Sequence, residues 1–315
     1  MTPEFDVIIS GAGPAGCTAA LALGPSGLRI AIIEKERFPR EKICGDGIPA
    51  YVPKVLDSIN TEYKKAFEAL PGKVEVDICR VISPANRILD LKFSECGYIC
   101  KRSVFDSFLF GLVNRLSNIT VFQETRVQDV VIGDHVVSVT TDKEGILKAK
   151  IIIGCDGATS ITRRKLTNRG IDPRHCSSAV RAYFRDVEDI PPQTLELHFV
   201  RELLPGYLWI FPMQDNVSNV GLGIPSAVVA KKKISLKKLL PAIIENNPIL
   251  RDRFKNAEMI GETWSYILPL GSRRASISGN RFMLCGDAAS LINPASGAGI
   301  GQAMQSGRYA GWHAA

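Results

Sequence analysis

The N-terminal part of the chain consists of two short apolar runs on either side of an Ala- and Leu-rich segment. Residues 6–10 (Asp-Val-Ile-Ile-Ser) are mostly apolar and β-branched, which is typical of a strand buried on both faces. Residues 15–23 predict a helix, which Gly24-Pro25 ends. The run 29–34 predicts a second buried strand that stops at an acid, Glu34. This order predicts a βαβ unit and a parallel sheet.

The rest of the chain mixes helical and strand-like patterns. Helices are expected over residues 50–70, 103–117 and 235–255, and strands over residues 74–82, 87–93, 262–268 and 281–285. A further βαβ-like return is expected over 120–155. Between 177 and 225, short strands broken by Pro and Gly predict an antiparallel sheet. A Gly- and Ala-rich helix is expected at the C-terminal end.

Charge narrows the class of partner. The 315 residues carry a formal net charge of +7, which suits anionic partners such as phosphates and nucleotides. The basic residues are too dispersed to indicate a nucleic-acid partner. Their main cluster, Lys231–Lys233 with Lys237 and Lys238, is interpreted as a solvated helix face, and contact with a membrane surface is the alternative.

Compartment and metal content follow from what the sequence lacks. The first residues have no basic and apolar signal-peptide pattern, and no stretch approaches the roughly 18 apolar residues that span a bilayer. We therefore expect a cytoplasmic protein, with peripheral contact to a membrane left open. None of the eight cysteines forms a C-x-x-C pair, so reduced thiols and no metal site are expected.

A glycine motif lies between the first predicted strand and helix. Gly11 permits a tight turn, Gly13 lets the backbone approach a pyrophosphate, and Gly16 lets the helix pack close to the strand. The helix N-terminus offers free N–H groups to the phosphates. Glu34 follows Gly11 by 23 residues, where its carboxylate can accept hydrogen bonds from an adenosine ribose. The loop predicts a dinucleotide site.

Two later motifs also follow apolar strands. The first is Gly154-Cys155-Asp156-Gly157, which alone would be an ordinary turn. The second is Cys285-Gly286-Asp287, followed by Asn293-Pro294 and Gly297-Ala298-Gly299-Ile300-Gly301. Asp287 ends a buried strand, and Gly299 and Ile300 can present main-chain N–H groups from the start of a helix.

These three motifs, in this order, resemble the FAD-containing family with the para-hydroxybenzoate hydroxylase fold. The resemblance spans essentially the whole chain and implies an FAD extended through the first loop, with Asp287 at the ribityl chain. It implies that Asp156 and Gly157 belong to a motif associated with both FAD and the reduced nicotinamide cofactor. The expected cofactor-binding residues are Gly11, Gly13, Pro14, Ala15, Gly16, Glu34, Lys35, Cys44, Gly45, Gly47, Arg102, Val127, Asp156, Gly157, Asp287, Pro294, Gly299 and Ile300.

The same resemblance implies an α/β fold in two interleaved domains. A Rossmann-type FAD-binding domain is expected from residues 1–70, 98–175 and 275–315. A smaller antiparallel-sheet substrate domain is expected from residues 71–97 and 176–274.

Two further segments narrow the family. Both resemble segments of geranylgeranyl reductases. The first is Lys42-Ile43-Cys44-Gly45-Asp46-Gly47, and the second is Pro205-Gly206-Tyr207-Leu208-Trp209-Ile210-Phe211-Pro212, which is followed by Asn219-Val220-Gly221-Leu222-Gly223. Tyr207, Trp209 and Phe211 project from one face of a strand by alternation. Spacing alone favours an aromatic core stripe, whereas the flavin motifs favour the wall of a cavity that holds an isoprenoid chain.

The resemblance implies a reaction. Reduced FAD would deliver hydride from N5 to a C=C double bond of a prenyl lipid, with NADPH or another reductant as the electron donor. Cys44, Tyr207 and water are the candidate proton donors, and Cys44 has the alternative of a small residue packed against the flavin. The competing hypotheses are a class A flavin monooxygenase on an aromatic or lipid substrate and an electron-transferring flavoprotein without a substrate.

Relatives of this kind usually continue well past the terminal helix. We therefore expect a shortened chain or a short family member, with an open pocket edge. The sequence leaves the oligomeric state open.

Overall fold

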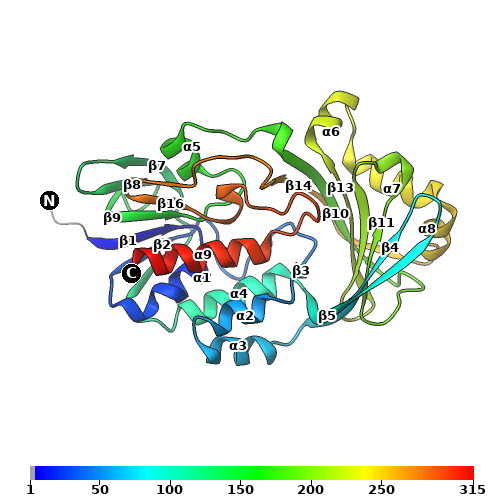
Figure 1. The fold of residues 1–315 in the computed structure, drawn as a ribbon, viewed down its shortest axis with the longest axis horizontal. Coiled ribbons are helices and arrows are strands. Elements are labelled where there is room, and N and C mark those ends of the chain that lie inside the picture. Colours follow the sequence, from blue (N-terminus) through cyan, green and yellow to red (C-terminus); the bar gives the residue numbers. More distant parts are fainter. Residues whose placement is uncertain (1–3) are drawn as a thin grey trace.

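The computed structural model describes residues 4–315 and contains two eight-stranded sheets that lie beside each other (Figure 1). Met1–Pro3, which begin both the segment examined for a signal peptide and the first expected domain, lie outside the described residues. No helix in the described part of the chain is both long and apolar enough to cross a bilayer.

The first sheet is built on the expected parallel βαβ unit. Its strands are β1 (Phe5–Ser10), β2 (Ile30–Ile33), β6 (Ile119–Phe122), β7 (Val127–Ile132), β8 (Val137–Thr141), β9 (Ile146–Gly154), β15 (Ser278–Gly279) and β16 (Phe282–Leu284). The order β15-β16-β9-β1-β2-β6 places β1 between two parallel neighbours, with Ile9 opposite both Ile32 and Ile153. The central strands β1 and β2 are almost completely buried, because helices cover one face of the sheet and the β7–β8 hairpin covers the other.

Six helices accompany the first sheet. They are α1 (Pro14–Leu23), α2 (Val52–Asp57), α3 (Thr61–Glu68), α4 (Arg102–Val113), α5 (Ile161–Thr167) and α9 (Ile300–Ala314). The helix α1 is buried along its whole length, since α9 and α4 pack around it. Gly307 allows the closest approach of α9, because a Cβ there would lie 2.1 Å from the carbonyl oxygen of Ala15. The two ends of the described chain therefore form one packed unit (Figure 1).

One predicted element is wrong. The expected βαβ-like return over 120–155 contains no helix, because residues 127–141 form the antiparallel β7–β8 hairpin that continues into β9. The segment is rich in Val, Ile and Thr, and Gly133-Asp134 lies at its turn, both of which favour a hairpin over a helix.

The second sheet is largely antiparallel, as expected. Its strands are β3 (Gly47–Ile48), β4 (Lys73–Ile82), β5 (Ile88–Cys100), β10 (Cys176–Arg185), β11 (Thr194–His198), β12 (Tyr207–Pro212), β13 (Val217–Pro225) and β14 (Glu258–Pro269), in the order β14-β10-β13-β12-β11-β4-β5-β3. The exception is β11, which pairs with β4 in parallel. The division into domains at residues 70, 97, 175 and 274 stays a prediction.

The outer face of the second sheet is closed by three helices, α6 (Ser226–Lys232), α7 (Leu236–Asn246) and α8 (Pro248–Arg253) (Figure 1). Leu208 and Ile210 of β12 pack with Leu240 of α7 in a separate core. Residues of the opposite parity on β12 therefore face the first sheet.

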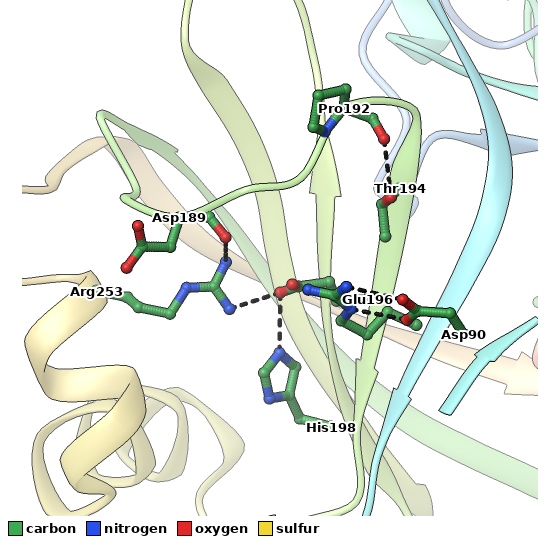
Figure 2. A network of polar contacts seen from close by, with 8 residues as sticks. Asp90, Asp189, Pro192, Thr194, Glu196, His198 and Arg253 are labelled. Carbon is green, nitrogen blue, oxygen red and sulfur yellow. Dashed lines mark hydrogen bonds and ion pairs between the residues drawn. The ribbon is translucent and has the colours of Figure 1, made fainter. Parts of the chain in front are cut away.

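A buried polar network ties α8 to this outer face (Figure 2). Glu196 of β11 accepts hydrogen bonds from Arg253 (2.6 Å) and from the ring of His198 (3.1 Å). All three side chains are buried. Their neighbours in the strand, Leu195 and Leu197, face the other way and line a cavity. The network stabilises the sheet from behind and does not belong to that cavity.

Candidate active site

A large cavity of about 1360 Å³ lies between the glycine loop of the first sheet and the inner face of the second. Of the residues expected from sequence to bind the cofactor or substrate, all but Gly16 line it. The cavity is larger than an ordinary small-molecule pocket, so it has room for a dinucleotide and a second ligand.

Two glycines of the loop, Gly11 and Gly16, leave no space for a side chain. A Cβ at Gly11, whose φ is +98°, would lie 2.5 Å from the carbonyl oxygen of Cys155. A Cβ at Gly16 would lie 1.8 Å from the carbonyl oxygen of Gly11. Gly16 therefore contributes by letting α1 pack against the loop, which explains why it does not line the cavity. The N-terminus of α1, with Pro14 as its first residue, is open to an anionic ligand.

Glu34 braces this loop from the end of β2. Its carboxylate accepts hydrogen bonds from the backbone N–H of Ala12 (2.7 Å) and of Glu36 (3.0 Å). A carboxylate has about four acceptor positions. The same side chain can therefore order the loop and still accept a ribose hydroxyl from the cavity.

The two later aspartates differ in how free they are. Asp156 accepts hydrogen bonds from Ser160 and from the backbone N–H and hydroxyl of Thr162 (2.9 and 3.0 Å), so its carboxylate holds the start of α5. Asp287 accepts one long hydrogen bond of 3.4 Å from the Tyr266 hydroxyl. Of the two, Asp287 has the greater capacity to bind a ligand hydroxyl.

A buried ion cluster lies beside the loop. Arg102 of α4 makes two hydrogen bonds to Asp106 (2.7 and 2.8 Å), and Arg40 approaches the same carboxylate at 3.1 Å. Burial alone would lower the pKa of Arg102, but the Asp106 carboxylate more than offsets this and raises it. Arg40 also lies within 3.5 Å of the position a Gly13 Cβ would take, so it adds a positive charge where a pyrophosphate would sit. Sequence reasoning missed Arg40, which belongs to no motif.

The cysteine loop and the aromatic strand, which the sequence treats as separate signals, meet at one amide. Asn219 of β13 donates hydrogen bonds to the carbonyl oxygen of Cys44 (2.8 Å) and to the carboxylate of Asp46 (2.7 Å), and accepts one from the Trp209 indole (2.9 Å). Asp46 is fully buried and also accepts a hydrogen bond of 2.8 Å from the Tyr183 hydroxyl. The loop is therefore held directly against the inner face of the second sheet.

Burial changes the acidity of two groups in this loop. It raises the pKa of the Cys44 thiol above its usual value, and the nearby Arg102 only partly offsets this. It also raises the pKa of Asp46, against the hydrogen bonds from Asn219 and Tyr183. The Cys44 thiol therefore carries its proton at neutral pH.

The aromatic stripe of β12 forms a cavity wall. Tyr207, Trp209 and Phe211 line the cavity, with ring centroids 6.3 and 6.2 Å apart along the strand. The indole of Trp209 lies over Gly221, where a Cβ would come within 2.3 Å of the ring. The rings of Phe211 and Trp209 also lie within 3.6 Å of the position a Gly45 Cβ would take. An apolar wall thus adjoins the cysteine loop.

Two further cavity residues are not among those expected from the sequence to bind the cofactor or the substrate. Lys42 lies with its amino group 3.2 Å from the ring centroid of Tyr266. Burial lowers the pKa of Lys42 to about 8, although the negative charge of Asp287 opposes the shift. Arg181 of β10 is buried and lines the cavity beside Tyr183.

The residues around the cavity fit FAD. The loop around Gly11 admits a pyrophosphate and no side chain, Glu34 and Asp287 offer acceptors to its two sugar-like parts, and Arg40 adds positive charge.

Comparisons with known proteins agree with this site. A family model described as the FAD binding domain matches residues 4–315. The chain is 31% identical to the digeranylgeranylglycerophospholipid reductase of Methanosarcina acetivorans, across 99% of this chain and 75% of that protein. It is 27% identical to the menaquinone reductase of Mycolicibacterium smegmatis, across 98% of this chain and 76% of that one.

A solved structure shows the same fold. A geranylgeranyl bacteriochlorophyll reductase-like protein from Thermoplasma acidophilum matches with a TM-score of 0.84 and 26% identity, covering 98% of this chain and 77% of that one. The expected α/β fold of the para-hydroxybenzoate hydroxylase type is therefore confirmed, and FAD is its cofactor. The chain belongs to the FAD-dependent oxidoreductases of the geranylgeranyl reductase type.

Proposed function

We propose that this protein reduces C=C double bonds of a prenyl lipid. The observation that carries the proposal is the contact between the aromatic wall and the cysteine loop, since it puts an apolar surface for a long chain next to the cofactor cavity. The names of the Methanosarcina reductase and the Thermoplasma structure support an isoprenoid substrate.

The cofactor-binding residues have separate tasks in this proposal. Gly11, Gly13 and the start of α1 would hold the pyrophosphate, with Arg40 and Arg102 nearby. Glu34 would accept a hydrogen bond from the ribose and Asp287 one from the ribityl chain, and the backbone of Gly299 and Ile300 would hold the ring. When bound and reduced, FAD supplies a hydride from N5.

The chain's own residues supply position and a proton. Tyr207, Trp209 and Phe211 hold the alkene chain and keep water out of the cavity. An isolated alkene has no carbonyl to polarise, so no oxyanion hole is required. We assign the proton at the second carbon to the Cys44 thiol, which is protonated at neutral pH and lies on the loop that faces the cavity.

The test is anaerobic turnover. Protein that is loaded with FAD and reduced by dithionite or NADPH should convert a geranylgeranyl lipid into heavier products. Each reduced double bond gains two hydrogen atoms, which adds about 2 mass units. A flavin monooxygenase would instead need oxygen and add an oxygen atom. An electron-transferring flavoprotein would cycle between redox states and change no lipid. Oxygen consumption coupled to product would overturn the reductase proposal.

Peripheral membrane contact is a further part of the proposal. The lysines of α6 and α7, including Lys231, Lys232 and Lys238, are exposed and form one basic region. Sedimentation with vesicles that contain about 30% anionic lipid would test this membrane contact. Binding that is equal on neutral vesicles would argue against an electrostatic contact.

A further inference from the structure

The cavity contains a buried guanidinium that no carboxylate of the described residues pairs with directly. Arg181 has 5% of its surface exposed and lines the cavity. Within residues 4–315 its guanidinium makes no hydrogen bond and no ion pair, and its Nε is fully buried without a partner. Its guanidinium carbon lies over the ring of Tyr183, 4.1 Å from the ring centroid.

A second cation lies on the same face of the sheet. Lys42 rests on the ring of Tyr266, and no carboxylate or carbonyl in the described part of the chain accepts a hydrogen bond from its amino group. In the pairing of β14 with β10, Tyr266 lies opposite Ala179 and Trp264 lies opposite Arg181. The ring that carries Lys42 is therefore two positions along the strand from Arg181. We call Lys42 and Arg181 the cationic corner. Arg40 and Arg102, which also line the cavity, differ because they share Asp106.

An uncompensated buried charge is expensive. Moving a guanidinium from water into a protein interior costs on the order of several kcal/mol. The cost is lower when a partner of opposite charge replaces the water. A protein can carry such a cost at a binding site, where the ligand supplies the partner. The planar donors of Arg suit a phosphate in particular, and a nearby Lys adds a point charge.

We propose that Lys42 and Arg181 form a subsite for a phosphate group, which would be the phosphate or diphosphate at the head of the prenyl substrate. This assignment of a lipid phosphate rests on the proposed function. It makes the substrate class an anionic prenyl lipid, in contrast to a neutral prenyl quinone. The phosphate of a pyridine nucleotide that reduces the flavin has the same chemistry and is the second source to be tested.

The competing role for Arg181 is that of a counter-ion to Asp46. Asp46 is buried nearby, and Arg181 lowers the energy of its charged form. However, the hydrogen bonds to Asp46 come from Asn219, Tyr183 and the backbone N–H of Arg102, and none comes from Arg181. The two roles predict opposite effects on stability.

The first experiment measures phosphate binding directly. Inorganic pyrophosphate is titrated by calorimetry into the FAD-loaded protein, whose glycine loop is then occupied. Arg181→Gln should weaken binding by 10-fold or more, on the order expected for a charge-assisted hydrogen bond. Lys255→Gln, an exposed lysine outside the cavity, is the matched control and should not change it. Equal binding by the wild-type protein and Arg181→Gln would overturn the subsite.

The second experiment identifies the source of the phosphate. With dithionite as reductant, kcat/KM is measured for geranylgeranyl diphosphate and for geranylgeraniol. In Arg181→Gln the ratio of the first value to the second should fall by about 10-fold or more, because one charged contact to the diphosphate is lost. With NADPH as reductant, a rise in its KM together with an unchanged lipid ratio would assign the same subsite to the nucleotide. If the wild-type protein reduces neither lipid, the proposed function fails, whereas pyrophosphate binding still decides the subsite.

The third measurement is thermal unfolding of the FAD-loaded protein without phosphate. If the guanidinium waits for a ligand, Arg181→Met should raise the Tm, because it removes an unpaired buried charge. If Arg181 compensates Asp46, the same substitution should lower the Tm, and this result would overturn the proposal.

Discussion

The indole nitrogen of Trp209 donates a hydrogen bond of 2.9 Å to the side-chain oxygen of Asn219. The amide nitrogen of the same Asn219 donates to Cys44 and Asp46 on the adjoining cysteine loop. One fully buried amide therefore sets the distance between the aromatic wall and the cysteine loop. Any change at Asn219 should be felt both by the substrate wall and by the loop beside FAD.

We expect Asn219→Ala to destabilise the protein by about 2–4 kcal/mol, because it leaves several buried polar groups without partners. Trp209→Phe removes only the indole donor and should cost less, about 1–2 kcal/mol. Urea unfolding of both variants measures the difference. A larger cost for Trp209→Phe than for Asn219→Ala would show that the indole packs for reasons other than this hydrogen bond.

Replacement of Gly16 should abolish FAD binding. In Gly16→Ala the new Cβ would lie 1.8 Å from the carbonyl oxygen of Gly11, so α1 must move away from the loop. Gly111→Ala is the matched control, because no atom lies within 4 Å of that Cβ and alanine favours the helix α4 by about 0.5–1 kcal/mol. The flavin absorbance that remains after desalting checks both. FAD retained in full by Gly16→Ala would contradict the packing role.

Patterns in the sequence identified what depends on local geometry. Gly11, Gly13 and Gly16 have a fixed spacing because a strand, a turn and a helix must meet at the pyrophosphate, and Tyr207, Trp209 and Phe211 alternate because a strand does. The β7–β8 hairpin escapes such a pattern, because its apolar Val and Ile residues suit either a helix or a strand and only the turn at Gly133 separates the two.

Other features have no local pattern. Arg181 is notable only because the folded chain gives it no partner, and Asn219 because three segments converge on its amide. Asp156 lines the cavity as expected, but hydrogen bonds from Ser160 and Thr162 already occupy its carboxylate. The surroundings of Arg181 and Asn219 arise from pairing between distant strands, which no spacing within one segment records.

Substitution of Cys44 tests the proton donor. The raised pKa of its thiol keeps the proton on sulfur at neutral pH. A serine hydroxyl is a much weaker acid, so Cys44→Ser should lower kcat by about 10²–10⁴-fold, the usual contribution of a general acid. The flavin spectrum should not change. Turnover equal to that of the wild-type protein would show that Cys44 only packs against the flavin.

The network behind the second sheet should stabilise the protein in a pH-dependent way (Figure 2). Burial alone would raise the pKa of Glu196, but His198 and Arg253 more than offset it, so the pKa is lower than in an unfolded chain. This stability is present at neutral pH and is lost as the pH falls through the lowered pKa. Glu196→Gln should therefore cost about 3–5 kcal/mol near pH 7 and progressively less below about pH 4.

An exposed ion pair in the same sheet provides the comparison for Glu196. Asp90 pairs with Arg80 through two hydrogen bonds of 2.8 Å, but its side chain is 43% exposed. Asp90→Asn should have little effect on stability, because water screens the pair. Chemical denaturation at several pH values measures both variants. Equal costs for Asp90→Asn and Glu196→Gln would mean that burial does not strengthen the network.

The charge on Lys42 should destabilise the ligand-free protein below about pH 8. Burial lowers its pKa to about 8, an effect that Asp287 and Cys44 oppose and that Arg102 and Arg40 reinforce. In the unfolded chain its pKa is about 10.4. Between these values the unfolded state binds the extra proton, so this residue makes the folded state more stable as the pH rises. Lys42→Met should therefore gain stability over the wild-type protein at pH 7, and the gain should vanish near pH 10.5.

Urea unfolding of the apoprotein measures this difference in stability. It is done at about pH 7, 9 and 10.5, which lie below, between and above the two pKa values. Lys165→Met, whose side chain is 42% exposed beside Asp129, is a control with no expected gain of this kind. In FAD-loaded protein, whose glycine loop is occupied, saturating pyrophosphate should reverse the sign at pH 7, because an anion bound at Lys42 stabilises only the protein that keeps the charge. The difference in the free energy of unfolding between Lys42→Met and wild type could instead stay constant across the pH range. That result would mean that the lysine amino group is solvated in the folded state and is not a desolvated cation in the cavity.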